Sequence, residues 1–240
     1  MDRIKIRYSF KLGKEVTETF DLQLDAQTLE FKGEIPEVLP VWARLDFHQC
    51  PHCPLDIGDY PNCPLAVNLV NILDRFDSLF SYNHTRLIVT TKDRMVSKVT
   101  TVQEAVGSLL GLVIAGSNCP HTVYLRPMAR FHLPLASSQE TLFRSVTTYL
   151  LAQYFLKKDG KDVDFDLVGL KEVYHRVHLV NRYIADRLRA EAKTDSILNA
   201  IVQLDVNAQN LISGIEDSLE DLRILFLPYM NLTISHISTK

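Results

Sequence analysis

Residues 4–24, IKIRYSFKLGKEVTETFDLQL, alternate apolar and polar side chains on both sides of a turn that contains Gly13. Apolar residues occupy every second position over 4–10, and again over 16–24 apart from an interruption at Glu18. A period of two on both sides of a glycine turn predicts an antiparallel β-hairpin with one apolar face. We expect Glu18 to lie near the edge of the buried area, and we expect the rest of the chain to cover that face.

Two further kinds of regularity extend beyond this hairpin. Residues 86–91 and 95–99 alternate around a short polar turn, which predicts a second hairpin. Apolar spacings of three and four residues, and a hydroxyl three residues before a glutamate at some starts, predict helices. The expected helices are 65–80, 101–116, 138–158, 167–192, 195–212 and 213–227. The hydroxyl–carboxylate pairs are Thr101–Glu104, Ser137–Glu140 and Ser213–Glu216. The fold class is therefore α+β, with small N-terminal antiparallel β-hairpins packed on a mostly helical body.

The chain divides at the segment 157–164, which contains a glycine and is interpreted as a linker. Residues 1–158 hold the β-hairpins, a cysteine- and proline-rich region and the first helices. Residues 159–230 form a C-terminal helical region that packs on them. The polar end, 231–240, is expected to fray.

Residues 33–64 contain six of the ten prolines of the chain, which excludes long regular structure there. This segment is therefore expected to be a loop. Three large apolar residues within it are expected to anchor it to the core. They are Trp42, Leu45 and Phe47.

Composition excludes several classes of protein. Of the 240 residues, 46% are hydrophobic and 23% are charged, which are ordinary globular values. The formal net charge of −3 provides no basic field for nucleic acid. The apolar run 105–116 is too short to cross a bilayer, and residues 1–10 do not resemble a signal peptide. The chain is therefore expected to be cytoplasmic, with neither a nucleic-acid nor a membrane partner.

All four cysteines are followed by proline, at Cys50, Cys53, Cys63 and Cys119. With ten prolines among 240 residues, chance produces this on the order of a few times per million. Proline restricts its own backbone and that of the preceding residue, so four cysteines of this kind are preorganised for ligation. Cys63 also stands at an expected helix start, where the helix dipole favours a thiolate. Four cysteines in a cytosolic chain indicate metal ligands or redox groups rather than disulfides.

The spacing C-x2-C-x9-C-x55-C provides three local ligands and one remote ligand, a pattern common to zinc and iron–sulfur sites. His48, His52 and His121 flank the cysteines and could replace one of them, which favours zinc. The all-cysteine set suits an iron–sulfur cluster, and Pro54 stands where a zinc ribbon has glycine. The four could also be small buried apolar side chains without a metal. We favour zinc, with an iron–sulfur cluster as the alternative, and both require Cys119 to approach the other three.

A basic cluster follows the last cysteine. His121, Arg126, Arg130 and His132 lie close together in the sequence and could bind a carboxylate or phosphate, or surround the metal site. They could equally cap helix ends or pair with acidic residues such as Glu140.

Several segments of the sequence resemble a family of uncharacterised bacterial proteins, a domain of unknown function. They are LDFHQCPHCPL (45–55), YPNCPLAVNLV (60–70), SNCPHTVYLRPMARFHLPLAS (117–137) and ETLFRSVTTYLLAQYF (140–155). The resemblance covers most of the chain. It implies that the four Cys-Pro steps belong to one site, and it implies no activity.

Three functions are open at this point. The first is a metal-stabilised protein that acts through protein interaction, with the helices over 167–227 facing a protein partner or a second copy. The second is an iron–sulfur redox or electron-transfer protein, or a metal sensor, with the basic cluster as an adjacent anion site. The third is an enzyme with Cys119 as nucleophile and His121 or His132 as base. We favour a non-catalytic role, because no GxGxxG, P-loop, HExxH or GxSxG motif occurs and four equivalent Cys-Pro steps indicate equivalent roles.

Overall fold

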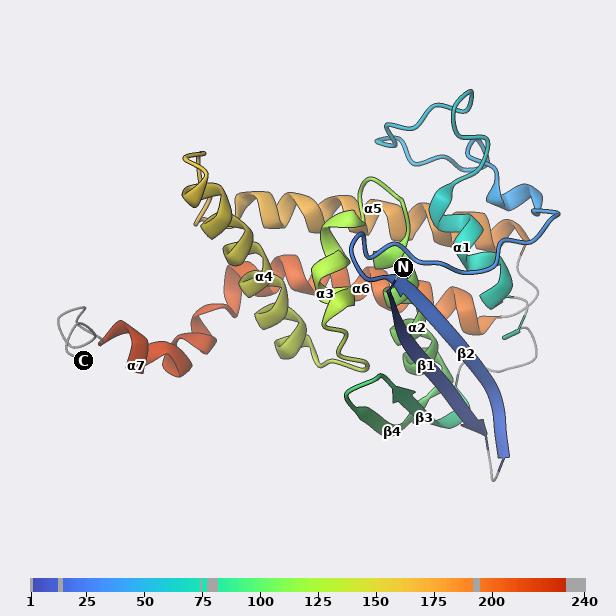
Figure 1. Cartoon of the computed structure of the whole chain (residues 1–240), viewed down its shortest axis with the longest axis horizontal. Coiled ribbons are helices and arrows are strands. Elements are labelled where there is room, and N and C mark those ends of the chain that lie inside the picture. The colour runs from blue at the N-terminus through green and yellow to red at the C-terminus, as the bar shows by residue number, and fades with distance from the viewer. Residues whose placement is uncertain (1, 13–14, 74, 77–81, 192–194, 232–240) are drawn as a thin grey trace.

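The computed structural model describes the chain except residues 1, 13–14, 74, 77–81, 192–194 and 232–240. It has an antiparallel four-stranded sheet and a larger helical part, so the expected α+β class is confirmed (Figure 1). The fraying expected over 231–240 falls almost entirely outside the described residues.

Both expected hairpins are present, and they join into a single sheet of order β2-β1-β3-β4. The strands are β1 (Arg3–Leu12), β2 (Glu15–Asp25), β3 (His84–Thr90) and β4 (Met95–Thr101). β1 pairs with β3 through Tyr8 and Val89, both of which are buried. Glu18 is half-buried and accepts hydrogen bonds from Arg75, with Arg75 Nη2 at 2.5 Å, in keeping with its expected place at the edge of the apolar face.

Five of the α-helices follow the expected apolar stripes, with two corrections, and two short α-helices, α3 and α7, were not predicted. Their bounds are α1 (Pro64–Leu73), α2 (Val102–Gly116), α3 (Arg126–Arg130), α4 (Ser138–Lys158), α5 (Val168–Glu191), α6 (Asp195–Asp217) and α7 (Leu227–Met230). The helix predicted over 65–80 already ends at Leu73, residues 75–76 form a turn, and 77–80 lie outside the described residues. Among the described residues, no helix is both long and apolar enough to cross a membrane.

The helix predicted over 213–227 was wrong. Ser213 lies inside α6, which continues to Asp217 and is followed by a 3-10 segment, Glu220–Phe226. The reason is that Ile215, 7% exposed, continues the buried stripe of α6 after Leu211. Continuing the helix beyond Ser213 therefore buries more apolar surface.

The other two capping predictions differ in outcome. At α4 the full capping box forms, with the Ser137 hydroxyl accepting from the Glu140 N–H and the Glu140 carboxylate accepting from the Ser137 N–H. At α2 only half of it forms, because Thr101 accepts from the Glu104 N–H while the Glu104 carboxylate accepts from the Thr100 hydroxyl instead.

The segment after α4 is a helix terminus of the Schellman type. Gly160 has φ +72°, its N–H donates to the Lys157 carbonyl, and the Lys161 N–H donates to the Leu156 carbonyl. A glycine is favoured at this position because other residues rarely adopt a positive φ. The chain therefore reverses direction between α4 and α5, where the linker was expected.

The apolar interior forms two clusters. One lies between the sheet, α1 and α2, and the other lies between α4, α5 and α6. α5 and α6 contribute to both, with Ile184 and Ile201 in the first cluster and Val177 and Leu211 in the second. These two long helices therefore connect the sheet-containing half of the molecule to the helical half (Figure 1).

Candidate functional site

The four cysteines line one small cavity. Cys50 and Cys53 come from the proline-rich loop, Cys63 directly precedes α1, and Cys119 follows α2. The cavity has a volume of about 20 Å³, which is room for a single water-sized occupant. The remote cysteine thus lies at the same cavity as the three local ones, and all four are free thiols.

The proline-rich loop is closed by backbone pairing on either side of the first cysteine pair. Arg44 and Asn62 form a β-bridge, and the Cys63 N–H donates to the Ala43 carbonyl at 2.8 Å. The Cys53 N–H donates to the Cys50 carbonyl at 3.0 Å, which folds the two cysteines into one turn. As expected, the loop is anchored by Trp42 and Leu45, which are buried, and by Phe47, which packs on the first core cluster.

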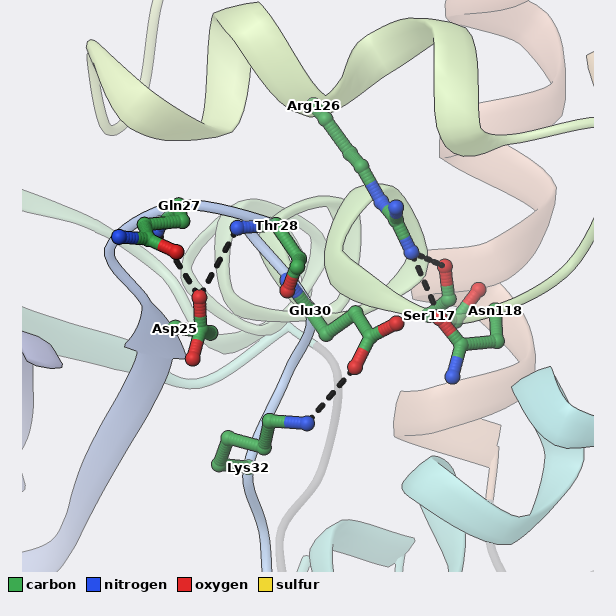
Figure 2. Close-up of polar contacts among 8 residues, drawn as sticks. All are labelled: Asp25, Gln27, Thr28, Glu30, Lys32, Ser117, Asn118 and Arg126. Carbon is green, nitrogen blue, oxygen red and sulfur yellow. Dashed lines mark hydrogen bonds and ion pairs between the residues drawn. The ribbon is translucent and has the colours of Figure 1, made fainter. Parts of the chain in front are cut away.

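The loop that carries Cys119 is fixed by side-chain hydrogen bonds. The Thr122 hydroxyl donates to the Ile114 carbonyl at 2.9 Å, and the Arg126 guanidinium donates to the Ser117 carbonyl and, at 2.6 Å, to the Asn118 side-chain oxygen (Figure 2). The end of α2 therefore holds the loop that carries Cys119.

The turn after β2 lies beside this loop (Figure 2). Asp25 accepts from the N–H groups of Gln27 and Thr28, both at 2.9 Å, and the Phe31 N–H donates to the Gly116 carbonyl at 2.7 Å. A Cβ at Gly116 would lie 2.9 Å from the Leu24 side chain, so the close approach requires a glycine there. The end of α2 is thereby held against the edge of the sheet.

Arg187 of α5 lines the same cavity, and the sequence analysis missed it. Its side chain is 1% exposed. It donates to the carbonyls of Trp42 (2.8 Å), Arg44 (2.5 Å) and Leu45 (3.0 Å), while its Nε has no partner. Among the described residues, no carboxylate forms an ion pair with it. The signal was available, because Arg187 falls three residues after Ile184 on the apolar stripe of α5.

The electrostatics of the cavity oppose isolated thiolates. Burial raises the pKa of the Cys50 thiol to about 12, with further contributions from Cys63, Cys119 and Cys53, whereas Arg187 opposes the rise. Burial likewise raises the pKa of the Cys119 thiol to about 11. Near neutral pH these two groups are therefore protonated thiols, and a cation that binds there has to displace protons.

The side chains are not arranged as a finished coordination sphere. In the part of the chain that the structure describes, no group of three or more His, Cys, Asp or Glu is placed to hold a metal ion. The cysteines share a cavity, so binding of an ion would require their sulfur atoms to turn towards a common point.

Two histidines border the cysteines. The rings of His52 and His121 stack with their centroids 4.1 Å apart, and His121 Nε2 donates to the His52 carbonyl at 2.9 Å. Both ring nitrogens of His52 are buried and have no hydrogen-bond partner among the described residues. His48 has φ +46° and packs against the Phe47 ring, and it does not line the cavity.

The four residues considered for an anion site lie in different surroundings. His121 lines the cysteine cavity, Arg126 holds the Cys119 loop, and Arg130 is exposed with its guanidinium 5.4 Å from the centre of the Phe131 ring. His132 bonds the Tyr8 hydroxyl, and burial lowers its pKa to about 3. The basic residues therefore do not converge on one point.

Cys119 lies in an environment unlike that of a nucleophile. Reactive cysteines are partly exposed and have lowered pKa values, whereas Cys119 is buried with a raised pKa. His132, the second base considered, lines a different cavity. This geometry argues against the nucleophile hypothesis.

Fold and site together define an α+β protein in which a cysteine cavity lies between a proline-rich loop and the end of the helix that covers the sheet. The sequence matches, over residues 4–227, the family described as a domain of unknown function (DUF6901). The chain belongs to this family, so the resemblance to an uncharacterised family is confirmed. No curated protein and no solved structure matches the chain.

Proposed function

We propose that this is a cytoplasmic metal-binding protein that holds one ion, zinc in the first place, through Cys50, Cys53, Cys63 and Cys119. The observation that carries the proposal is that these four cysteines line one cavity together with a buried arginine. The ion would tie the proline-rich loop to the end of α2. Free thiols in such a number suit a reducing compartment, which supports the cytoplasmic assignment.

The buried arginine supports a metal–thiolate centre with net negative charge. Transfer of an unpaired guanidinium into the interior is costly unless an opposite charge accompanies it. Four thiolates around a divalent ion carry a net charge of −2, which Arg187 would partly compensate. The three backbone carbonyls that accept from Arg187 fix its position beside the sulfurs.

The size of the cavity favours a single ion over a cluster. A volume of about 20 Å³ suits one small occupant, whereas an iron–sulfur cluster would require the loop to move outwards. The iron–sulfur alternative, as a redox or electron-transfer protein or a metal sensor, is supported by the four cysteines and is the second candidate.

A structural role follows from where the ligands lie. Three of them belong to a loop without long regular structure, and the fourth belongs to a rigid helix end. Metal binding at such a site contributes directly to folding free energy. We therefore propose that the protein acts through interaction with another polypeptide and that the ion maintains the shape of the loop.

The decisive experiment is elemental analysis of protein purified under anaerobic conditions. We expect one zinc per chain in the wild type and less than about a tenth of that in Cys119→Ser and Cys63→Ser. His48→Asn is the matched control, because it removes a possible ligand outside the cavity and asparagine tolerates the positive φ at this position. Folded protein that stays metal-free after reconstitution with zinc would contradict the proposal, and a brown protein with iron and sulfide would favour the second candidate.

The partner that we propose is a second copy of the chain, bound through the C-terminal helices. The uncharged segment 224–230 is largely exposed and includes Tyr229, at 73% exposure. Exposed apolar patches mark interaction surfaces, and an uncharged patch can face its own copy across a two-fold axis. Light scattering should report a dimer that becomes a monomer in Leu225→Asp, with Asp217→Asn as a control; a monomeric wild type would exclude self-association.

A further inference from the structure

A second and much larger cavity also borders α5. Its volume is about 840 Å³, and its walls come from α2, α4, α5, α6 and the residues between α3 and α4. This volume is within the range of about 300–1,000 Å³ typical of small-molecule sites. The cysteines do not line it.

The walls combine apolar and polar side chains, and the apolar ones present the larger surface. Aliphatic and thioether side chains from several elements converge on the cavity. They include Leu112, Met128, Leu133, Val177, Leu204 and Leu211. Binding of an apolar molecule to such a lining is favourable, because it removes apolar surface from water.

One polar group stands out on these walls. Asn181 of α5 is 3% exposed, and within the described part of the chain its side-chain amide forms no hydrogen bond. Its side-chain atoms remain open to the cavity, where water can hydrogen-bond them. An occupant that displaces this water has to offer a hydrogen-bonding group to Asn181, because an amide left unpaired costs about 1–3 kcal/mol.

The charges on the walls disfavour an anionic occupant. Arg144 is engaged by the carbonyls of Met128 (2.8 Å) and Phe131 (3.0 Å). Hydrogen bonds from Ser137 lower the pKa of Glu140, and Arg144 and Lys98 lower it further, so both cations lie close to this carboxylate. Glu104 and Asp221 also line the cavity, so three carboxylates stand against two cations and an anion would meet net negative charge.

We propose that this cavity binds a neutral, mainly apolar small molecule that hydrogen-bonds Asn181. The site is separate from the cysteine cavity and requires no metal. An experiment can therefore disprove ligand binding here without disproving metal binding at the cysteines. Val180 lines the cysteine cavity and Asn181 the larger one, so the two sites share α5 as a wall.

The test uses two probes that differ in charge. N-phenyl-1-naphthylamine is neutral and apolar with one N–H group, and 1-anilinonaphthalene-8-sulfonate is its sulfonated, anionic counterpart. On titration of the full chain we expect saturable fluorescence enhancement with the neutral probe at one site per chain, and at least about tenfold weaker binding of the anion. Absence of saturable binding of the neutral probe, or equal binding of both probes, would overturn the proposal.

Two variants locate the binding. Asn181→Leu should weaken the neutral probe about tenfold without lowering the melting temperature of the unliganded protein, because the amide makes no hydrogen bond to another described residue. A merely structural asparagine would instead give a lower melting temperature. Gly111→Phe should block the cavity, and its new Cβ would meet a Leu204 methyl carbon at an ordinary contact distance of 3.6 Å. Val202→Phe, on the exposed side of α6, is the control and should bind like the wild type. Unchanged affinity in both test variants, with folding verified by circular dichroism, would refute the site.

Discussion

The two cavities that border α5 differ in what their polar groups lack. Among the described residues, the guanidinium at the small cavity has no carboxylate partner, and the Asn181 amide at the large cavity has no hydrogen bond. The first absence favours a centre with net negative charge, such as an ion bound by four thiolates, and the second favours a molecule with a hydrogen-bonding group. A buried group that its own protein leaves unpaired thus indicates the chemistry of what it binds.

The cavities also differ in how much of the fold should depend on their occupants. The small cavity lies against a loop with few backbone ladders, so its ion would hold the loop in place. The large cavity is enclosed by helices that pack in the second apolar cluster without any occupant. Loss of the ion should therefore destabilise the protein more than loss of the neutral ligand does.

Removal of the metal is expected to have the largest effect. A chelator that competes with thiolates should lower the free energy of unfolding by about 4 kcal/mol or more, as expected for a ligand bound with about a thousandfold excess over its dissociation constant. Urea denaturation of zinc-loaded and stripped protein measures this difference. Affinity for N-phenyl-1-naphthylamine should stay within about twofold in the stripped, still folded protein, and a loss of both properties together would show that the cavities are not independent.

Replacement of the buried arginine should rank second. Arg187→Met removes the charge and three hydrogen bonds to backbone carbonyls, which should cost about 3–5 kcal/mol in the zinc-loaded protein. Arg187→Lys, which keeps the charge, should recover part of this loss. If Arg187→Met were as stable as the wild type and retained its zinc, the charge argument for the small cavity would be wrong.

The pH dependence of stability should reflect a histidine of the large cavity. Burial, helped by Arg144, lowers the pKa of His132 from 6.5 to about 3. Between these two pH values the imidazole is therefore protonated in the unfolded chain and neutral in the folded chain. Stability must then fall as the pH drops from 6.5 towards 3. Between pH 7 and pH 5 we expect His132→Gln to lose about 1–2 kcal/mol less than the wild type does. Parallel stability curves for the two proteins, measured by urea denaturation at each pH, would exclude this cause.

The smallest effects should come from the N-caps of α4 and α2. Ser137→Ala breaks the full capping box of α4 and should cost about 1 kcal/mol. Thr101→Ala removes the half-formed box of α2 and should cost about half as much. Thermal unfolding of both variants measures the difference, and zinc content should stay at the wild-type level in each; a larger cost at Thr101 would contradict the assignment.

Local patterns predicted most of the elements. The alternation over 4–24 and the stripes of α5 and α6 were sufficient because each encodes one buried face. The capping pair at Ser213 misled because a serine also fits inside a helix when the apolar stripe continues, as it does at Ile215. Nothing local indicates that β1 pairs with β3, because that contact forms between distant segments.

The residues of the two cavities were likewise only partly predictable from the sequence. The repeated Cys-Pro steps predicted that Cys119 would lie with the other three cysteines, and the structure places all four at one cavity. Arg187 could have been found as a charge on the apolar stripe of α5. Asn181 and its cavity could not, because a void between helices depends on how they pack and leaves no periodic mark in the sequence.

The position of β1 between β2 and β3 has a consequence for synthesis on the ribosome. The first hairpin emerges early, but β1 cannot pair with β3 until residues 84–90 have been translated. Cys50, Cys53 and Cys63 emerge within this interval, whereas Cys119 emerges after it. An ion captured by the nascent chain would therefore be held by three sulfurs and remain exchangeable until the sheet and α2 have been completed.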